Sequence, residues 1–285
     1  MSWDVITIVL MCLVVILAGV IRYGAYRGET VARSLRGRLE DAREPVHPAA
    51  FYAGELLNLP APVQRYFRAV LTDGQPMVTA VTVHHTGTFN MSETGERWRP
   101  FVSTQRVVTR RPGFDWDGRI RILPGLAVRV HDAYVAGEGL LNATLLGLIP
   151  LVNMRGTPEV AQGELMRFFA EAAWYPTVLL PSQGVQWESV DDCSARATLH
   201  DGPIRLSMLF RFDEDGLIAS VRAEARGRTS GGRVVPTPWE GRWNRYALHD
   251  GMRIPVEGEV AWLLPRGPKP YWRGRITSIR CEFAS

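Results

Sequence analysis

The chain has 285 residues, of which 46% are apolar and 22% are charged, and its formal net charge is +4. These values are ordinary for a globular protein with a real hydrophobic core, and they exclude a disordered chain. Lys269 is the one lysine, and the arginines are scattered among the expected strands, so no nucleic-acid partner is predicted. Cys12, Cys193 and Cys281 imply neither a disulfide framework nor a zinc site, although a disulfide between the last two stays open.

An uncharged apolar run occupies residues 5–21, with Thr7 as its single polar residue. Its length is at the short end of the range for a membrane-spanning helix, and Trp3 and Tyr23 suit the two interfaces. A secretory signal peptide is the competing interpretation. However, no Lys or Arg precedes the run, and the small-x-small cleavage pattern is poor. We therefore predict an uncleaved transmembrane anchor over residues 1–22.

Arginines follow the apolar run closely and none precedes it. The positive-inside rule then places the C-terminal domain in the cytoplasm. Residues 23–54 are predicted to form a basic juxtamembrane helix and a linker, and this helix can also touch anionic lipid headgroups. The arginines are Arg22, Arg27, Arg33, Arg36, Arg38 and Arg43.

From residue 77 onward the hydrophobic period is two, which predicts strands. Asp-Gly pairs at residues 201–202, 215–216 and 250–251 separate alternating runs and indicate hairpins. We predict one mainly β (α+β) domain over residues 55–285. Its strongly curved antiparallel sheet of about ten strands wraps around one or two helices.

Residues 157–175 are the predicted central helix. Thr157 can cap it, Pro158 suits its first position, and Pro176 should end it near Tyr175. Apolar residues recur at three- and four-residue spacing along it, so one face should pack against the sheet. These residues are Leu165, Phe168, Phe169 and Ala172.

Residues 139–154 form an almost uninterrupted apolar stretch that contains Pro150 and is too short to span a bilayer. A buried core helix is the favoured interpretation. The alternatives are a flap over an apolar cavity and a segment that dips into the membrane interface.

Candidate catalytic or metal-binding groups are sparse. His84 and His85 are adjacent in a predicted strand and point to opposite faces, so they cannot share a metal, and no metal site is predicted. Asp115 and Asp117 share a face, but a bend at Gly118 is favoured over acid–base chemistry. No serine elbow, phosphate loop or dinucleotide fingerprint is present, so no cofactor is predicted.

The polar side of the central helix carries Glu164, Arg167 and Glu171 at helical spacing. An ordinary ion-paired face is the favoured interpretation. If that side faced a cavity, these residues would form the best polar site in the chain. A membrane-bound hydrolase that uses Glu171 or Asp132 with Arg167 is the resulting enzymatic alternative, but no residue is predicted to be catalytic.

Several sequence runs resemble an uncharacterised bacterial family known as a domain of unknown function. The resemblance covers roughly residues 55–282 and implies no established activity. More loosely, a long antiparallel sheet curved around helices is similar in architecture to carriers of lipoproteins and lipids in bacterial envelopes. The runs are LPAPVQRY at residues 59–66, EAAWYPTVLLP at 171–181, FDEDG at 212–216 and GMRIP at 251–255, together with Pro238-Trp239.

The leading functional hypothesis is a membrane-tethered binding module for an apolar, lipid-like molecule that lies between the curved sheet and the helices. Mostly apolar pockets with few polar groups are typical of such sites. The alternatives are a membrane-bound enzyme of unknown reaction and a structural partner-binding domain. The predicted ligand-binding residues are Phe168, Glu171, Trp174, Tyr175, Trp262 and Trp272.

Overall fold

The computed structural model describes residues 3–285, so the first two residues of the predicted anchor lie outside it. Thirteen strands form one open antiparallel sheet in the order β6-β5-β4-β3-β2-β1-β13-β12-β11-β10-β9-β8-β7. Strands that are consecutive in sequence pair with each other, except β6 and β7, which form the two edges of the sheet. Strand β13 returns to pair with β1 and so joins two meanders. The predicted class, a mainly β antiparallel fold, is confirmed, with thirteen strands instead of about ten.

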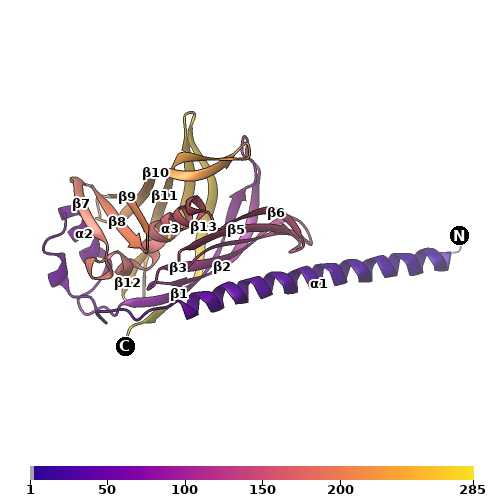
Figure 1. Cartoon of the computed structure of the whole chain (residues 1–285), viewed down its shortest axis with the longest axis horizontal. Helices are drawn as coiled ribbons and strands as arrows, with labels where there is room; N and C mark the ends of the chain where they lie inside the picture. The colour runs from indigo at the N-terminus through magenta and orange to yellow at the C-terminus, as the bar shows by residue number, and fades with distance from the viewer. Residues whose placement is uncertain (1–2) are drawn as a thin grey trace.

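The strands vary from short edge strands to long central ones that bend around the core (Figure 1). They are β1 (Val78–Asn90), β2 (Trp98–Val108), β3 (Gly113–Leu123), β4 (Leu126–Val135), β5 (Glu138–Leu145), β6 (Ile149–Arg155), β7 (Gln186–Asp191), β8 (Ser194–Asp201), β9 (Ile204–Phe212), β10 (Ile218–Ser230), β11 (Arg233–His249), β12 (Met252–Leu264) and β13 (Gly267–Phe283).

Three α-helices accompany the sheet, and short 3₁₀ turns extend two of the connections. The α-helices are α1 (Trp3–Asp41), α2 (Ala61–Val70) and α3 (Pro158–Ala170), and the 3₁₀ helices are η1 (Ala53–Leu56), η2 (Glu171–Trp174), η3 (Pro176–Leu179) and η4 (Pro181–Gln183).

Helix α3 lies inside the curve of the sheet and contacts strands of both meanders, β3 to β6 on one side and β9 and β10 on the other (Figure 1). Thr157 caps it by accepting a hydrogen bond from the Val160 backbone, and Pro158 occupies its first turn, as predicted. The α-helix ends at Ala170, and η2 continues the turn to Trp174 before Pro176. Proline at that position excludes a further helical hydrogen bond.

Helix α1 runs without a break through the predicted anchor and the predicted juxtamembrane helix. Its C-terminal half packs on the outer face of the sheet, where Leu35 and Leu39 form a buried cluster with Ala133 and Val135 of β4. Its N-terminal half extends away from the sheet with exposed apolar side chains (Figure 1). This half is long and apolar enough to cross a membrane or to serve as a signal sequence.

The favoured prediction of a buried helix over residues 139–154 is wrong, because β5 and β6 form a hairpin there. Leu146 and Gly147 adopt positive φ angles of 54° and 73° and reverse the chain, a conformation that glycine supplies easily. The backbone groups of β5 pair with β4, so tertiary pairing overrides the helical reading of an apolar run. This unpredicted hairpin adds two strands to the count.

Candidate functional site

The six predicted ligand-binding residues lie on the inner side of the sheet or on the segment that it encloses. Phe168 and Tyr175 are fully buried, their ring centroids are 5.6 Å apart, and the Tyr175 hydroxyl donates to the Phe168 carbonyl at 2.8 Å. The rings of Trp174 and Trp272 both contact the His85 ring. The ligand-binding role of these residues stays a prediction.

Trp262 belongs to a neighbouring group. Its ring stacks on Tyr271 with centroids 5.9 Å apart, and the Arg226 guanidinium lies 6.0 Å from its centre. The Tyr271 hydroxyl in turn accepts a hydrogen bond from Trp239 at 2.9 Å. The Trp239 N–H and the Tyr271 hydroxyl are therefore hydrogen-bonded to each other within this group.

A continuous series of aromatic rings crosses the inner face from β11 to β2, and we call it the aromatic band. Trp243 meets Trp174 at 5.0 Å between centroids, and Trp174 meets His85 at 4.8 Å. His85 continues to Trp272 at 6.0 Å, and Trp272 to Phe101 at 5.8 Å. Aromatic pairs at these separations stabilise a core beyond their buried area.

Trp116 of β3 completes the aromatic band at 5.8 Å from Phe101. All its members are buried, yet several donors or acceptors of the band have no hydrogen-bond partner within the protein. Buried polar groups are nearly always paired, so this concentration of unpaired groups in one region needs an explanation. The atoms are Nε1 of Trp116, Trp174, Trp243 and Trp272, and Nε2 of His85.

Glycines support the aromatic band from within the sheet. Gly258 and Gly274 face each other on β12 and β13, and a Cβ atom at either position would clash with the Trp243 or Trp272 ring. Gly87 of β1 pairs with Gly274 and also leaves no room for a Cβ. The row of glycines therefore lets large rings lie flat against the strands.

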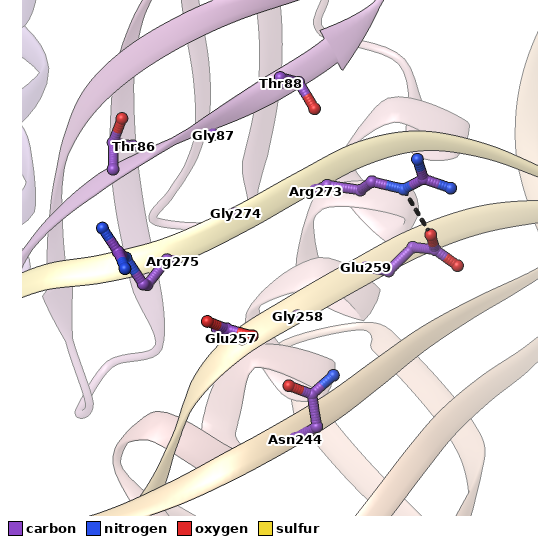
Figure 2. A pocket seen from close by; sticks show the side chains of 10 residues that line it. All are labelled: Thr86, Gly87, Thr88, Asn244, Glu257, Gly258, Glu259, Arg273, Gly274 and Arg275. Atoms are coloured by element: carbon purple, nitrogen blue, oxygen red, sulfur yellow. Dashed lines mark hydrogen bonds and ion pairs between the residues drawn. The ribbon is translucent and has the colours of Figure 1, made fainter.

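The same glycine row forms the floor of a broad groove of about 530 Å³ on the outer face (Figure 2). Its walls are polar, and Figure 2 shows Arg273 and Glu259 joined by an ion pair, which is 2.7 Å long. Glu257 is also paired, with Arg245 at 3.2 Å. Exposed, self-paired charges of this kind contribute little and offer no apolar surface, so the groove is a poor fit for a lipid-like ligand.

A buried charge cluster lies beside one end of the aromatic band. Arg167 of α3 donates to Glu171 at 2.8 Å and also forms an ion pair with Asp132 of β4. Gln105 of β2 donates to Glu171 at 2.6 Å. Arg167 lies 5.2 Å from the centre of the Trp116 ring, so it connects the cluster to the band.

The cluster has more carboxyl groups than arginines. Arg226 of β10 reaches Glu164 at 3.4 Å, which leaves Asp132, Glu164 and Glu171 with Arg167 and Arg226. Glu164 Oε2 and Asp132 Oδ1 are buried without a partner. One proton shared by these two carboxyl groups satisfies both atoms. We therefore assign Glu164 as the protonated member of the cluster.

The pKa values support this assignment. Burial raises the pKa of Glu164 well above its ordinary value and the charge of Asp132 adds to the rise, while Arg226 opposes it. Burial lowers the pKa of His85 to about 3, with Arg167 and His84 adding to the effect, so the ring beside Trp174 is neutral. Burial alone lowers the pKa of Arg167, but the surrounding carboxylates outweigh it and raise the value.

A second cleft, of about 410 Å³, opens at the opposite end of α3 from its cap. Phe168, Val178 and Leu199 supply its apolar part, and Arg110 and Arg111 lie at its rim. Of the two described clefts, this one includes a predicted ligand-binding residue, Phe168. Its volume falls in the range of small-molecule sites.

Sequence reasoning found Glu164, Arg167 and Glu171, and it named Asp132 with Arg167 in the enzymatic alternative, but it missed Gln105 and Arg226. The favoured interpretation, an ion-paired face, holds for Arg167 and Glu171. The face is paired with strands and buried or nearly so, instead of solvated. Alternation did indicate that His84 and His85 face opposite ways, and His84 is indeed exposed while His85 is buried. No grouping of three or more metal-ligating side chains occurs within residues 3–285.

The chain belongs to the DUF6920 family, a family of unknown function, which matches residues 57–281. The predicted resemblance to an uncharacterised family is thereby confirmed. Among curated proteins, no sequence matches the chain.

Three solved structures illustrate distant similarity. The chain is similar, at 10% identity and a TM-score of 0.39, to a domain from Vibrio parahaemolyticus assigned to outer membrane lipoprotein sorting, with 71% of this chain and 85% of that one covered. It is similar, at 10% identity and a TM-score of 0.35, to a LolA superfamily protein from Nitrosomonas europaea, with 87% and 93% covered. A β-barrel-like protein of unknown function from Brucella abortus gives 8% identity and a TM-score of 0.22, with 72% and 99% covered.

Proposed function

We propose that the chain is a membrane-tethered module that binds an apolar, lipid-like molecule between its sheet and its helices. The observation that carries this proposal is the aromatic band, whose four indole N–H groups and one imidazole nitrogen have no partner in the protein. A mostly apolar surface with a few polar groups that fix orientation is the usual composition of a small-ligand site.

The unpaired atoms narrow the chemistry of the ligand. Indole nitrogen is a donor only, so Trp174, Trp243 and Trp272 call for acceptor oxygens. His85 is neutral and can donate or accept through Nε2. A molecule with long hydrocarbon parts and ester, carbonyl or hydroxyl oxygens meets both requirements, and an acylated lipid is the simplest member of that class.

The cleft beside Phe168 supports access for such a molecule. It lies between the β2–β3 turn, the η3–η4 segment and the β8–β9 turn, and its apolar side chains lead from the surface toward α3. Arg110 at the rim forms no ion pair with another described residue and can hold a negatively charged headgroup, since arginine binds phosphate and carboxylate with paired N–H groups. Arg111 is already paired with Asp201 at 3.1 Å.

Tethering through α1 places the domain next to a source of the ligand. An apolar helix next to the domain keeps it beside a bilayer, which is a reservoir of acylated lipids. The arginines that follow the apolar run favour a cytoplasmic position for the domain.

The test is photochemical labelling of the full chain in lipid nanodiscs that contain trace phospholipid with a diazirine in its acyl chain. We expect labelled peptides from the inner face, in particular those that contain Phe101 and Trp272. A Trp272→Phe variant keeps the ring and removes the donor, so it should lose inner-face labelling. Trp98→Phe is the matched control, because the Trp98 ring lies under Arg273 on the outer face.

Labels found only in α1 and on the outer face would contradict the proposal and would favour the structural partner-binding alternative. The enzymatic alternative depends on the charge cluster of Arg167, Asp132 and Glu171, which the fold does bring together. Neither of the two clefts is lined by any of these three residues. A substrate has therefore less access to them than to the residues that line the Phe168 cleft.

A further inference from the structure

The β5–β6 hairpin meets α1 just beyond the apolar part of that helix. Gly24 of α1 and Gly147 of the hairpin turn approach so closely that a Cβ atom on either would clash with the other segment. Gly24 lies three residues after Ile21, which is about 4.5 Å along a helix. If residues 5–21 cross a bilayer, the hairpin turn is held at the level of its surface.

The hairpin presents apolar side chains that nothing in the described protein covers. Ile149 and Leu151 of β6 are 56% and 52% exposed, and Val152 is 38% exposed. The β3–β4 turn points the same way, because alternate turns of an antiparallel meander share an end, and it carries Leu123 at 57% exposure. Contiguous exposed apolar side chains mark a protein or membrane contact.

The two edge strands differ in charge, and the difference favours a membrane contact at β6. Edge strands that face water are usually protected by charged side chains, and the opposite edge β7 carries Glu188 and Asp191. Strand β6 has no charged residue before Arg155 at its end. An apolar edge strand next to a membrane-spanning helix is protected from aggregation if the lipid interface covers it.

Basic side chains surround this surface. Arg22 and Arg27 of α1, and Arg119 and Arg121 of β3, are exposed, and none of the four forms an ion pair with another described residue. Arg121 pairs across the ladder with Ala127, whose carbonyl accepts from Leu146, so it lies two strand spacings, about 10 Å, from the hairpin turn. Free arginines beside apolar tips are complementary to an anionic lipid surface.

We infer that the β5–β6 hairpin inserts its apolar tip into the interface of an anionic bilayer, with Arg119 and Arg121 at the headgroups. This inference rests on the tethering part of the proposed function and is independent of ligand binding. It makes the domain a body with a fixed orientation on the membrane, because helix and hairpin together give two points of attachment.

The test uses the full chain in nanodiscs with an environment-sensitive fluorophore on a single cysteine. In a background of Cys12→Ser, Cys193→Ser and Cys281→Ser, the fluorophore is placed at Ile149→Cys or Val190→Cys. Val190 is the matched control, because it is an apolar residue of the other edge strand and 49% exposed. We expect a blue-shifted emission and quenching by spin-labelled lipid at position 149, with neither effect at position 190.

The charge requirement is tested in the same system. Each arginine near an anionic surface contributes about 1 kcal/mol, roughly a fivefold factor in the contact equilibrium. Reversal at both positions, Arg119→Glu with Arg121→Glu, should therefore reduce quenching at position 149 strongly in anionic nanodiscs. The loss should be much smaller when all lipids are zwitterionic.

The outcomes separate this inference from the proposed function. If the chain does not float with lipid vesicles, the tethering is wrong and both fall. If it floats but position 149 is as water-exposed as position 190, the inference is overturned while inner-face labelling still decides the ligand. A blue shift that depends on protein concentration and not on spin-labelled lipid would also overturn it, because it would assign the β6 edge to a second copy of the chain.

Discussion

The two faces of β3 and β4 each bury a charge cluster, and the clusters differ in balance. On the outer face, Asp117 pairs with Arg129 at 2.6 Å and Asp115 with Arg36 of α1 at 3.1 Å. On the inner face three carboxyl groups share Arg167 and Arg226. The outer cluster is matched in charge and covered by a helix, and the inner cluster contains a surplus acid.

The two faces of β3 and β4 therefore have different roles: the outer face holds α1, and the inner face contributes to the aromatic band and the inner charge cluster. Strand alternation sends Asp115 and Asp117 outward and Trp116 inward, where it meets Phe101 of the aromatic band. The ion pair of Asp115 with Arg36 and the hydrogen bond from Arg129 to the Ala25 carbonyl help to fix the position of α1. The unpaired nitrogens of the aromatic band leave hydrogen-bonding capacity inside the sheet, which supports the proposed binding site.

The largest expected effect is at the centre of the inner cluster. Arg167→Met leaves Asp132 and Glu171 buried without a cation, which typically costs about 3–5 kcal/mol of the free energy of unfolding. Arg273→Met is the matched control, because Arg273 also pairs with a glutamate and lies over a tryptophan but is 50% exposed. Its loss should cost no more than about 1 kcal/mol. Urea unfolding of the full chain in micelles measures both, and equal losses would contradict the buried assignment.

Acid conditions should lower the stability of the fold through His85. Its folded pKa of about 3 lies below its ordinary value of 6.5, so the unfolded chain binds more protons between these limits. Stability should therefore fall as the pH decreases from about 6.5 toward 3. His85→Gln should flatten this limb of the stability profile, and His84→Gln, which removes only the smallest of the three effects on the His85 pKa, should change it much less. A profile that is identical in wild type and His85→Gln would show that another group titrates.

A rise in pH above 4.5 should lower the stability of the fold through the surplus acid of the inner cluster. The pKa of Glu164 is raised in the folded state, so the folded chain binds more protons above the ordinary value of 4.5. Stability should fall as the pH rises through the raised value, and Glu164→Gln should remove this loss. Glu138→Gln is the control, because Glu138 is 67% exposed and pairs with Arg38 at the surface. If Glu164→Gln is less stable than wild type at high pH, Glu164 is charged in the fold.

The sequence predicted the parts of this arrangement that depend on local pattern. Hairpin turns at Asp-Gly pairs, the Thr157 cap and the inward position of Trp174 and Trp272 follow from spacing alone. Of the three partners Gln105, Asp132 and Arg226, the sequence named only Asp132, in the enzymatic alternative with Arg167. They lie on three different strands, and only the curvature of the sheet brings them to α3.

The β5–β6 hairpin marks the other limit of prediction. A short apolar run fits a buried helix and a strand equally well, and only the pairing with β4 decides between them. Asp115 and Asp117 were read as a bend, and the structure keeps both in a regular strand that pairs with β2 and β4. Their role depends on Arg36 and Arg129, which no local spacing connects to them.

The smallest expected effect is at the matched outer pair, where both partners are removed together. Arg129 donates to both carboxylate oxygens of Asp117, at 2.9 and 2.6 Å, and its remaining N–H contacts the Ala25 carbonyl of α1 at 3.1 Å. Either single variant, Asp117→Asn or Arg129→Met, leaves a buried group unpaired and should cost about 3 kcal/mol or more. The double variant removes both charges and should lose only about 1 kcal/mol, mainly from the contact with α1. A double-mutant cycle by urea unfolding measures the coupling directly. Additive losses would mean that the two residues act independently, and the outer cluster would then not be the matched counterpart of the inner one.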